Sequence, residues 1–398
     1  MNALKLLKER GFIAQMTHEN EMYELFDKQK VVFYTGYDPT ADSLHIGHYL
    51  TFMASAWLQR AGHIPVVLMG GGTGMVGDPD KANEMRKMME ISEIDYNIEK
   101  FIEQAKRFID FEDDKAILAN NADWLRHLNY ASFIREYGVH FSVNQMLSAE
   151  KYKIKFETPN VGLNFFELNY VIMQAYDFLE LNRRFGCVLQ TGGSDQWSNI
   201  VAGVDLIRRV EGKDKPAFGL TFNLLLTSDG KKMGKTMDGT LWLNGQKTHP
   251  NDFYQYFRNL PDTDIKKCLL MLTFLPMDEI EELCAEEGAA MNRAKEVLAF
   301  EVTKIVHGEQ EAQNARDDLK SFAICAKDFG EGMNIMDVLV LTGLEKSKSD
   351  ARRSVQQGGA SAGGEKIADI GHMVRPQDLD DGKIIIQKGK KKVLIVVS

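Results

Sequence analysis

Short apolar runs that stop at glycine or at polar residues recur through the first 230 residues, and they constrain the fold more than any other feature. Five runs are rich in β-branched or aromatic side chains: Val31–Tyr34, Ile64–Met69, Ala116–Ala119, Val188–Leu189 and Phe218–Leu226. Runs of this kind are typical of buried strands. Stretches with helical spacing separate them, which favours an α/β fold with a mostly parallel sheet.

The segments between these runs are predicted to be helices. Residues 1–30 have the pattern of an amphipathic helix, and residues 82–110 have that of another. Ser43 follows a turn and is the expected N-cap of a third helix. Residues 122–185 contain more helical sequence than one crossover needs, so we predict a helical insertion there.

The pattern changes after about residue 245. From Asn251 to about Lys327 the spacing is helical throughout, and Gly330-Glu331-Gly332 then resembles a linker. A helix around Ala351–Val355 and two strands, Ile384–Ile386 and Val393–Val397, are expected after it. We therefore predict three domains, residues 1–245, 246–328 and 333–398.

Composition excludes several classes of protein. Hydrophobic residues make up 44% and charged residues 26%, which is typical of a globular chain and not of a disordered one. The 4 cysteines lack zinc-ligand or CxxC spacing, so we predict no bound metal and a reducing compartment. Neither a signal peptide nor a run of about 18 apolar residues is present, so we expect a cytoplasmic protein without membrane contact.

Charge is distributed unevenly along the chain. The net charge is −9, but residues 335–398 contain 11 Lys and Arg against 8 Asp and Glu. A basic tail on an acidic body suggests a local site for a polyanion.

Polar residues cluster where three of the predicted strands end. Because ligands bind at the carboxyl ends of parallel strands, we expect the three clusters to line one cleft. Their members are Tyr34, Gly36, Asp38, Thr40, His45 and His48, then residues 70–78, and then Gln190, Gly192, Gly193, Asp195 and Gln196.

The segment His45-Ile46-Gly47-His48 lies at the start of a predicted helix. A helix N-terminus attracts anions, and two imidazoles beside it can donate hydrogen bonds to phosphate oxygens. Gly47 lacks a β-carbon and would let a flat purine approach the backbone. Two ordinary surface histidines are the alternative interpretation.

A second cationic segment, Lys231 to Thr236, follows the turn at Asp229-Gly230. Lys232 and Lys235 could close on a pyrophosphate leaving group, although a solvated basic turn has the same composition. Together with the two histidines, these lysines predict contacts to the phosphates of one nucleotide.

This pair of segments resembles those of the class I aminoacyl-tRNA synthetases, and most closely those of the bacterial-type tyrosyl-tRNA synthetases. The resemblance covers nearly the whole chain and includes Tyr34–Thr40, Gly77–Pro79, Tyr170 with Gln174–Phe178, and Gly192–Trp197. It implies a Rossmann-like parallel-sheet catalytic domain with a helical insertion, an α-helical domain and a small α+β RNA-binding domain. The family joins tyrosine to ATP and then transfers the tyrosyl group to tRNA.

The resemblance also implies roles for individual residues around ATP and Mg²⁺. Because no enzyme nucleophile is needed, catalysis should depend on positioning and charge stabilisation. Thr40 and His45 are expected at the γ-phosphate, with His48 nearer the nucleotide and Thr51 and Asp195 near the ribose. The remaining nucleotide contacts implied are Gly36, Asp38, Gly47 and Gly193, with Lys232, Lys235 and Thr236 over the pyrophosphate.

The implied tyrosine pocket has a chemical rationale. A phenolic hydroxyl both donates and accepts, and Tyr34 and Asp177 match the family's partners for it. Phenylalanine would leave both groups unpaired, which is costly in a buried site. Asp78, Tyr170 and Gln174 match the binders of the α-ammonium group, and Gln196 matches a group near the carboxylate.

One stretch departs from the family's pattern. After Asp78-Pro79 the chain has residues 80–83 in place of the usual small residue, Gly and Lys. Arg86 aligns better than Lys81 with a family cation, either as a contact for the tRNA acceptor end or on a mobile loop.

The tail resembles the small RNA-binding domain named after ribosomal protein S four. Its phosphate-binding face would comprise Arg352 and Arg353 on a helix, and Lys388, Lys390, Lys391 and Lys392 on a hairpin turn. A solvated turn that protects a sheet edge is the alternative interpretation.

The resemblance implies L-tyrosine, ATP and tRNA(Tyr) as partners, and a homodimer with helices near residues 120–165 at its interface. A tryptophanyl-tRNA synthetase, a generic nucleotidylyltransferase and a non-catalytic tRNA-binding paralogue remain as alternatives.

Overall fold

The computed structural model describes residues 2–79, 88–158, 162–236, 239–285, 288, 291–317, 319–380, 382–389 and 391–397. The chain forms two compact units. The first contains residues 1–247 and 263–282, and the second contains residues 248–262 and 283–398.

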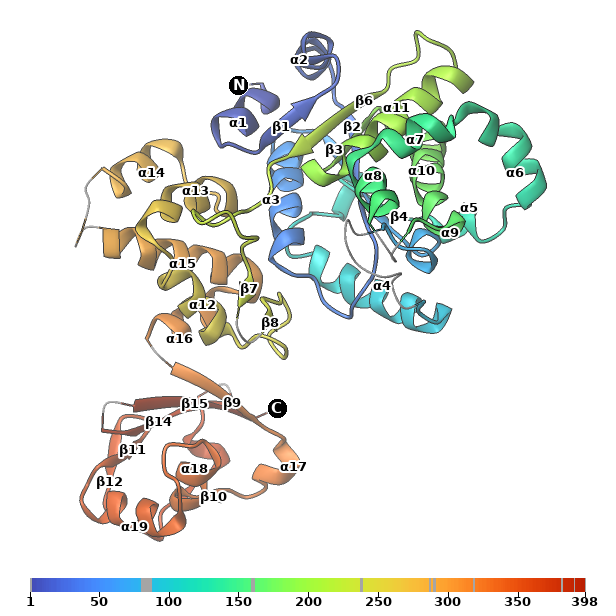
Figure 1. The fold of residues 1–398 in the computed structure, drawn as a ribbon. Coiled ribbons are helices and arrows are strands. Elements are labelled where there is room, and N and C mark those ends of the chain that lie inside the picture. The colour runs from blue at the N-terminus through green and yellow to red at the C-terminus, as the bar shows by residue number, and fades with distance from the viewer. Residues whose placement is uncertain are drawn as a thin grey trace. The chain divides into compact units, whose positions relative to one another are not determined.

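A six-stranded sheet is the centre of the first unit (Figure 1). Its strands, in spatial order, are β1 (Ile13–Met16), β6 (Phe218–Phe222), β5 (Leu189–Gly193), β2 (Val32–Tyr37), β3 (Ile64–Met69) and β4 (Ile117–Asn120). The β1 strand pairs antiparallel with β6, and the other pairs are parallel. The predicted α/β fold is confirmed.

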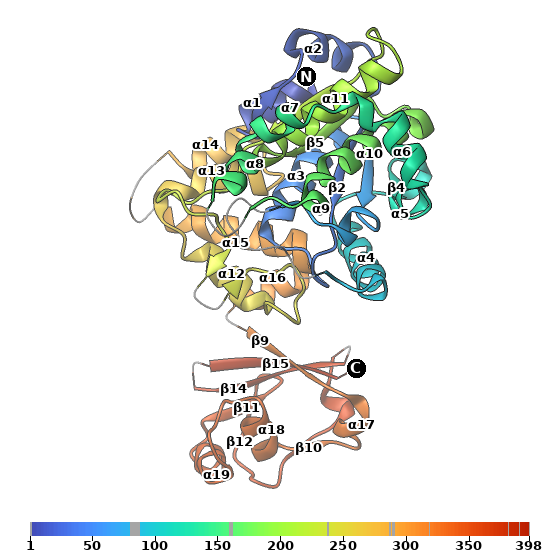
Figure 2. The ribbon, with the colours of Figure 1, turned by 45° about the vertical axis from the view of Figure 1, so that its right-hand side comes forward.

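Helices connect and cover these strands, as the two views of the ribbon show (Figures 1 and 2). Those before the insertion are α1 (Ala3–Glu9), α2 (Glu19–Lys28), α3 (Ile46–Arg60) and α4 (Ile91–Ala105). The segment between β4 and β5 is helical and comprises α5 (Ala122–Leu125), α6 (Tyr130–Glu136), α7 (Val143–Ser148), α8 (Glu150–Glu157), α9 (Phe165–Leu168) and α10 (Tyr170–Phe185). After β5 come α11 (Trp197–Val210) and a short hairpin, β7 (Lys235–Thr236) and β8 (Gly239–Thr240).

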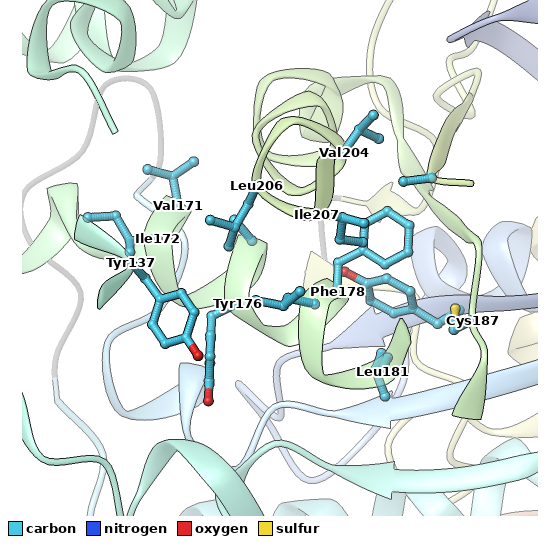
Figure 3. Close-up of a cluster of buried hydrophobic side chains, with 14 of the residues drawn as sticks. Tyr137, Val171, Ile172, Tyr176, Phe178, Leu181, Cys187, Val204, Leu206 and Ile207 are labelled. Atoms are coloured by element: carbon cyan, nitrogen blue, oxygen red, sulfur yellow. The ribbon is translucent and has the colours of Figure 1, made fainter. Parts of the chain in front are cut away.

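One buried apolar cluster joins the sheet to α10 and α11. Phe178, Leu181, Val204 and Ile207 are members with little or no exposed surface, and Figure 3 shows how their side chains lie. Gly203 lets α11 approach α10, because a β-carbon there would lie 3.1 Å from the Phe178 ring. This packing fixes α10, the helix that contains Tyr170, Gln174 and Asp177.

Two helices that follow in sequence also belong to the first unit, namely α13 (Asp262–Leu272) and α14 (Met277–Leu283). Arg10 is 2% exposed and donates to the carbonyls of Leu270, Thr273 and Leu275 at 2.9, 3.4 and 2.5 Å. Tyr49 donates to the Leu272 carbonyl at 2.6 Å. These bonds satisfy carbonyls in the last turn of α13 and just after it, and they attach the helix to the rest of the first unit, across the predicted boundary at residue 246.

The second unit begins with the helices α12 (Pro250–Arg258), α15 (Met291–His307) and α16 (Glu309–Arg316). A five-stranded sheet follows, in the order β12 (Glu365–Ile367), β11 (Ala360–Ala362), β14 (Lys383–Lys388), β15 (Lys391–Val397) and β9 (Leu319–Ile324). The other elements are α17 (Ala326–Phe329), β10 (Met333–Asn334), α18 (Ile335–Leu341), α19 (Lys348–Gln356) and β13 (Met373–Val374). Residues of α18, α19 and the sheet share one apolar core.

Three sequence expectations about secondary structure are wrong. Residues 1–30 are not one helix, because Gly11 adopts a φ of 80° and Ile13–Met16 then pairs with β6. Residues 251–327 are not helical throughout, since β9 pairs in parallel with β15. Gly330–Gly332 therefore lies inside the C-terminal fold, between α17 and β10, and does not link two domains.

The described residues include no helix whose length and hydropathy would allow it to cross a membrane.

Candidate active site

A cavity of about 470 Å³ lies at the carboxyl ends of β2, β3 and β5. Residues from all three predicted polar clusters line it, among them Asp38 and Asp78. Lys232, which follows β6, lines the same cavity as His45 and His48. The structure thus brings together the two cationic segments that the sequence separates by almost two hundred residues.

His45, and not Ser43, is the N-cap of α3. Its Nδ1 accepts from the Gly47 N–H at 3.1 Å, and the Nδ1 of His48 accepts from the His45 N–H at 3.2 Å. Ser43 lies too early in the chain, where its hydroxyl donates to the Leu44 carbonyl and accepts from the Asn244 N–H. Because both histidines accept through Nδ1, each carries its hydrogen on Nε2.

The two imidazoles are stacked, with their ring centroids 3.8 Å apart. Burial lowers the pKa of His45, and the charge of Lys232 lowers it further. Burial also lowers the pKa of His48, well below its usual value, and His45 beside it adds to this effect. Both side chains are therefore neutral hydrogen-bond donors at neutral pH.

Gly47 has a structural role that the sequence did not suggest. A β-carbon at this position would lie 2.9 Å from Cε1 of His45. The glycine therefore makes room for the capping imidazole itself, in addition to any approach by a purine.

We call residues 225–236 the lysine loop. It follows β6 and ends with β7, and its first part forms a separate hairpin. The N–H groups of Thr227 and Met233 donate to the carbonyls of Lys231 and Leu225, each at 2.8 Å. Just after it, Leu241–Leu243 pairs with Leu44–Ile46, through N–H···O bonds of 3.2 Å from Ile46 and 2.9 Å from Leu243. The start of α3 and the end of the loop region thus share one short ladder.

Asp177 is buried and lines the cavity. Its carboxylate accepts from Trp124 Nε1 at 2.7 Å and from Asn121 Nδ2 at 2.9 Å. Burial raises the pKa of Asp177 to about 8, although both hydrogen bonds oppose that rise. Each carboxylate oxygen can accept a second hydrogen bond, so the group retains capacity for a ligand.

The Tyr34 hydroxyl has no hydrogen-bond partner among the described residues, although the side chain is only 1% exposed. Burial raises the pKa of Tyr34 well above its usual value, and the nearby Asp177 raises it further. A buried unpaired hydroxyl is costly, so its presence in a cavity wall indicates a polar ligand group.

Sequence reasoning missed the residues that support Asp177. Asn121 also donates to Thr73 Oγ1 at 2.8 Å and accepts from the Gly72 N–H at 2.6 Å. Asn121 was visible in the sequence only as the polar end of a strand, and Trp124 had no signal at all. Both reach Asp177 through tertiary packing between the insertion and the sheet.

Asp38 and Tyr170 contact each other directly. The Tyr170 hydroxyl donates to Asp38 Oδ2 at 2.8 Å, and Thr73 Oγ1 donates to Asp38 Oδ1 at 2.7 Å. Asp38 thus fixes the phenol of Tyr170 in the cavity, which is a different role from the predicted contact to ATP.

Two of the predicted ammonium binders, Asp78 and Gln174, form an amide–carboxylate network with Gln196, the residue predicted near the substrate carboxylate. Gln196 Nε2 donates to Asp78 Oδ2 at 2.7 Å, and Gln174 Nε2 donates to Gln196 Oε1 at 3.4 Å. Asn199, a residue that sequence reasoning missed, donates to Gln174 Oε1 at 2.7 Å. These bonds fix the acceptor oxygens that a cation in the cavity would meet.

The predicted nucleotide side of the cavity contains Gly36, Thr40, Thr51 and Asp195. Thr51 donates to the His48 carbonyl at 2.9 Å. A β-carbon on Gly193 would lie 2.5 Å from Asp195 Oδ1, so this glycine allows the Asp195 carboxylate to fold over the strand end.

Several predicted site residues lie outside what the structure describes. Arg86 and Lys390 are not among the described residues, and the helix predicted over residues 82–110 is described only from α4 onwards. Lys235 and Thr236 are described only as the backbone of β7. Their functional roles stay predictions.

With this geometry established, comparison with known proteins decides the family. A family model described as tRNA synthetases class I (W and Y) matches residues 27–323. A second model, the tyrosine--tRNA ligase SYY-like C-terminal domain, matches residues 311–396. The chain belongs to the tyrosine--tRNA ligase family.

Individual relatives agree with this membership. The tyrosine--tRNA ligase of Clostridium kluyveri is 52% identical over 401 residues, which cover 98% of each chain. That of Lachnoclostridium phytofermentans is 54% identical over 98% of this chain and 97% of its own length. The resemblance to the bacterial-type tyrosyl-tRNA synthetases is therefore confirmed.

Solved structures of tyrosyl- and tryptophanyl-tRNA synthetases have a similar fold. A C-terminally truncated Aspergillus nidulans mitochondrial tyrosyl-tRNA synthetase superposes with a TM-score of 0.70 and 29% identity, over 79% of this chain and 92% of its own. A tryptophanyl-tRNA synthetase from Encephalitozoon cuniculi, at 15% identity and a TM-score of 0.58, covers 78% of this chain and 86% of its own. This second likeness concerns the fold alone.

The predicted RNA-binding residues of the family's C-terminal domain differ in their exposure and ion pairs. Arg352, Arg353, Lys391 and Lys392 are exposed, although Arg353 lies 3.8 Å from a carboxylate oxygen of Asp350. Lys388 forms a shorter ion pair of 2.9 Å with Glu345, which is 8% exposed. Its charge is therefore partly neutralised within the domain.

Proposed function

We propose that this chain joins L-tyrosine to ATP, giving tyrosyl-adenylate and pyrophosphate, and then transfers the tyrosyl group to the 3′ end of tRNA(Tyr). One observation carries the proposal. The Tyr34 hydroxyl, which has no hydrogen-bond partner in the described part of the chain, and the Asp177 carboxylate line the same cavity as His45, His48 and Lys232. A phenol can thus bind in one part of this cavity while phosphates bind in another.

The proposed first step needs no nucleophile from the protein. The tyrosine carboxylate attacks the α-phosphate, and pyrophosphate leaves. His45 and His48 donate hydrogen bonds to the phosphates from their neutral Nε2–H groups. The cations Lys232 and Lys235 offset the charge that develops on the leaving group. The hydroxyls of Thr40 and Thr236 donate further hydrogen bonds to the phosphates. The hydrogen-bond network holds the oxygens of Asp78 and Gln174 in fixed positions, which supports an ammonium site there, and it holds Gln196 for the proposed contact near the substrate carboxylate.

Mg²⁺ enters this scheme with ATP, since it is usually held by substrate phosphates and by one or two carboxylates. Within the described part of the chain, no group of three or more His, Cys, Asp or Glu side chains could hold a metal ion.

The deciding measurement is tyrosine-dependent exchange of labelled pyrophosphate into ATP by the purified, folded chain. We expect exchange with tyrosine and none without an amino acid. Absence of exchange would refute the proposed activation step.

Competition in the same assay separates the alternatives. The Tyr34–Asp177 pair favours a phenol over an indole, so tryptophan should neither support exchange nor compete with tyrosine at equal concentration. A non-catalytic tRNA-binding paralogue would instead bind tRNA tightly and exchange nothing.

We also propose a homodimer through the inserted helices. This region and β4 expose several large apolar side chains, and a partner subunit would cover them. Their exposed fractions are Leu118 43%, Tyr130 62%, Val139 72%, Val143 55%, Phe156 64% and Phe165 66%. Sedimentation at several concentrations should show a dimer, and Phe165→Asp should shift it towards the monomer.

A further inference from the structure

The lysine loop makes specific contacts with α13. The Lys267 ammonium donates to the Leu226 carbonyl at 3.1 Å. One oxygen of Asp264 accepts from the Ser228 N–H at 3.2 Å. Next to them, Cys268 Sγ lies 3.8 Å from Met233 Sδ in a buried contact. Helix α13 thus contacts both sides of the hairpin in the lysine loop, at Leu226 and Ser228 on one side and at Met233 on the other.

These contacts involve groups that are costly to bury unless they are bonded. Asp264 is 3% exposed, so its carboxylate depends on hydrogen bonds such as those from Ser228. The Ser228 N–H and the Leu226 carbonyl lie on the loop's own backbone, which makes both contacts independent of most loop side chains. The position of the loop backbone is therefore coupled to the position of α13.

The helix is itself anchored to the part of the unit that contains α3. Arg10 and Tyr49 bind carbonyls at the C-terminal end of α13, and the Arg10 guanidinium stacks over the Trp57 ring at 4.0 Å. Tyr49 and Trp57 both belong to α3, whose first residues follow His45. One helix thus connects the loop to the element that positions the two histidines.

Lys232 is directly linked to the part of the loop that α13 contacts. Its backbone pairs antiparallel with that of Leu226, and Lys267 donates to the Leu226 carbonyl. We infer that Asp264 and Lys267 are positioning residues, which hold the lysine loop so that Lys232 lines the same cavity as His45. This inference rests on the proposed function, because it assigns Lys232 to the pyrophosphate.

The helix offers a matched pair of lysines for the test. Lys266 is exposed and Lys267 is half-buried, so Lys266→Met is the control for Lys267→Met. In pyrophosphate exchange, Lys267→Met should lower kcat/KM for ATP about tenfold or more, the loss that corresponds to one hydrogen bond from a charged group. The Kd for tyrosine, measured without ATP, should stay within about twofold, and Lys266→Met should match the unmodified chain.

A double-mutant cycle distinguishes positioning from general destabilisation. If Lys267 acts through Lys232, then Lys267→Met should add little to the loss caused by Lys232→Ala. Asp264→Asn keeps an acceptor oxygen for Ser228 and should retain most activity, whereas Asp264→Leu should not.

Fully additive losses, or ATP kinetics of Lys267→Met equal to those of Lys266→Met, would overturn the inference. If Lys267→Met does not fold, equal exchange rates for Asp264→Asn and Asp264→Leu overturn it instead. Absence of exchange by the unmodified chain would count against the proposed function and not against the loop support.

Discussion

Gly234 packs directly against Ile46, the second residue of the histidine segment. A β-carbon at position 234 would lie 2.0 Å from Ile46 Cγ2, and the glycine has a φ of 85°. Glycine is therefore required for the lysine loop to rest on the start of α3. This contact joins the two segments that the sequence predicted to act on one nucleotide.

Gly234→Ala should lower the rate of tyrosine activation about tenfold or more, because it adds both a steric clash and left-handed backbone strain. Gly230→Ala is a matched control, since Gly230 has a φ of 81° in the same loop but open space around it. Pre-steady-state formation of the adenylate would measure both variants. Equal losses would mean that backbone strain, and not the contact with Ile46, limits the loop.

His45 should contribute separately to stability and to catalysis. Asparagine can replace its capping acceptor but not its Nε2–H donor. His45→Ala should therefore cost about 1 kcal/mol more in free energy of unfolding than His45→Asn, while both lose activation to a similar extent. Urea unfolding and pyrophosphate exchange are the measurements. Equal stability of the two variants would contradict the capping role.

Tyr34→Phe removes a buried hydroxyl that has no partner among the described residues of the free chain. The variant should unfold at an equal or higher temperature, because the unpaired group is lost. Discrimination between tyrosine and phenylalanine should fall about tenfold, since one hydrogen bond to the substrate phenol is absent. Comparing kcat/KM for the two amino acids tests this, and unchanged discrimination would show that Tyr34 does not contact the phenol.

Asp177 should make stability depend on pH. Its pKa is raised from 3.8 to about 8, so between these values the folded chain retains a proton that the unfolded chain has released. Its contribution to the free energy of unfolding therefore falls as pH rises through this window. Asp177→Asn removes the effect, so the melting temperature of the variant relative to the unmodified chain should rise by about 2 °C or more from pH 5 to pH 8. A difference that is constant with pH would contradict the raised pKa.

The C-terminal lysines should fall into two groups. Lys391→Met combined with Lys392→Met should weaken tRNA binding and make it less sensitive to salt, because each lysine that binds a phosphate releases about one counterion. Lys388→Met should mainly destabilise the domain, because it leaves Glu345 without its cationic partner. Filter binding at several KCl concentrations and thermal unfolding would separate them. Equal effects of all three lysines on tRNA affinity would contradict this division.

Local signals were sufficient for much of this fold. The runs at β2, β3 and β14 combine β-branched residues with clear ends, and these strands form close to where the pattern predicts them. The β1 and β9 strands could not be found in this way, since each depends on a partner far away in sequence.

The site residues also divide into those with a local sequence signal and those without one. Residues proposed to contact the ligands belong to recognisable motifs, whereas Asn121, Trp124 and Asn199 act through other side chains and have ordinary local sequence.

The ladder between Leu44–Ile46 and Leu241–Leu243 has a consequence for protein engineering. Because each segment supplies backbone partners for the other, the two behave as one module despite the chain between them. A chimera that imports the histidine segment from a distant relative must also import residues 234–243, or its nucleotide pocket will be assembled from surfaces that do not fit.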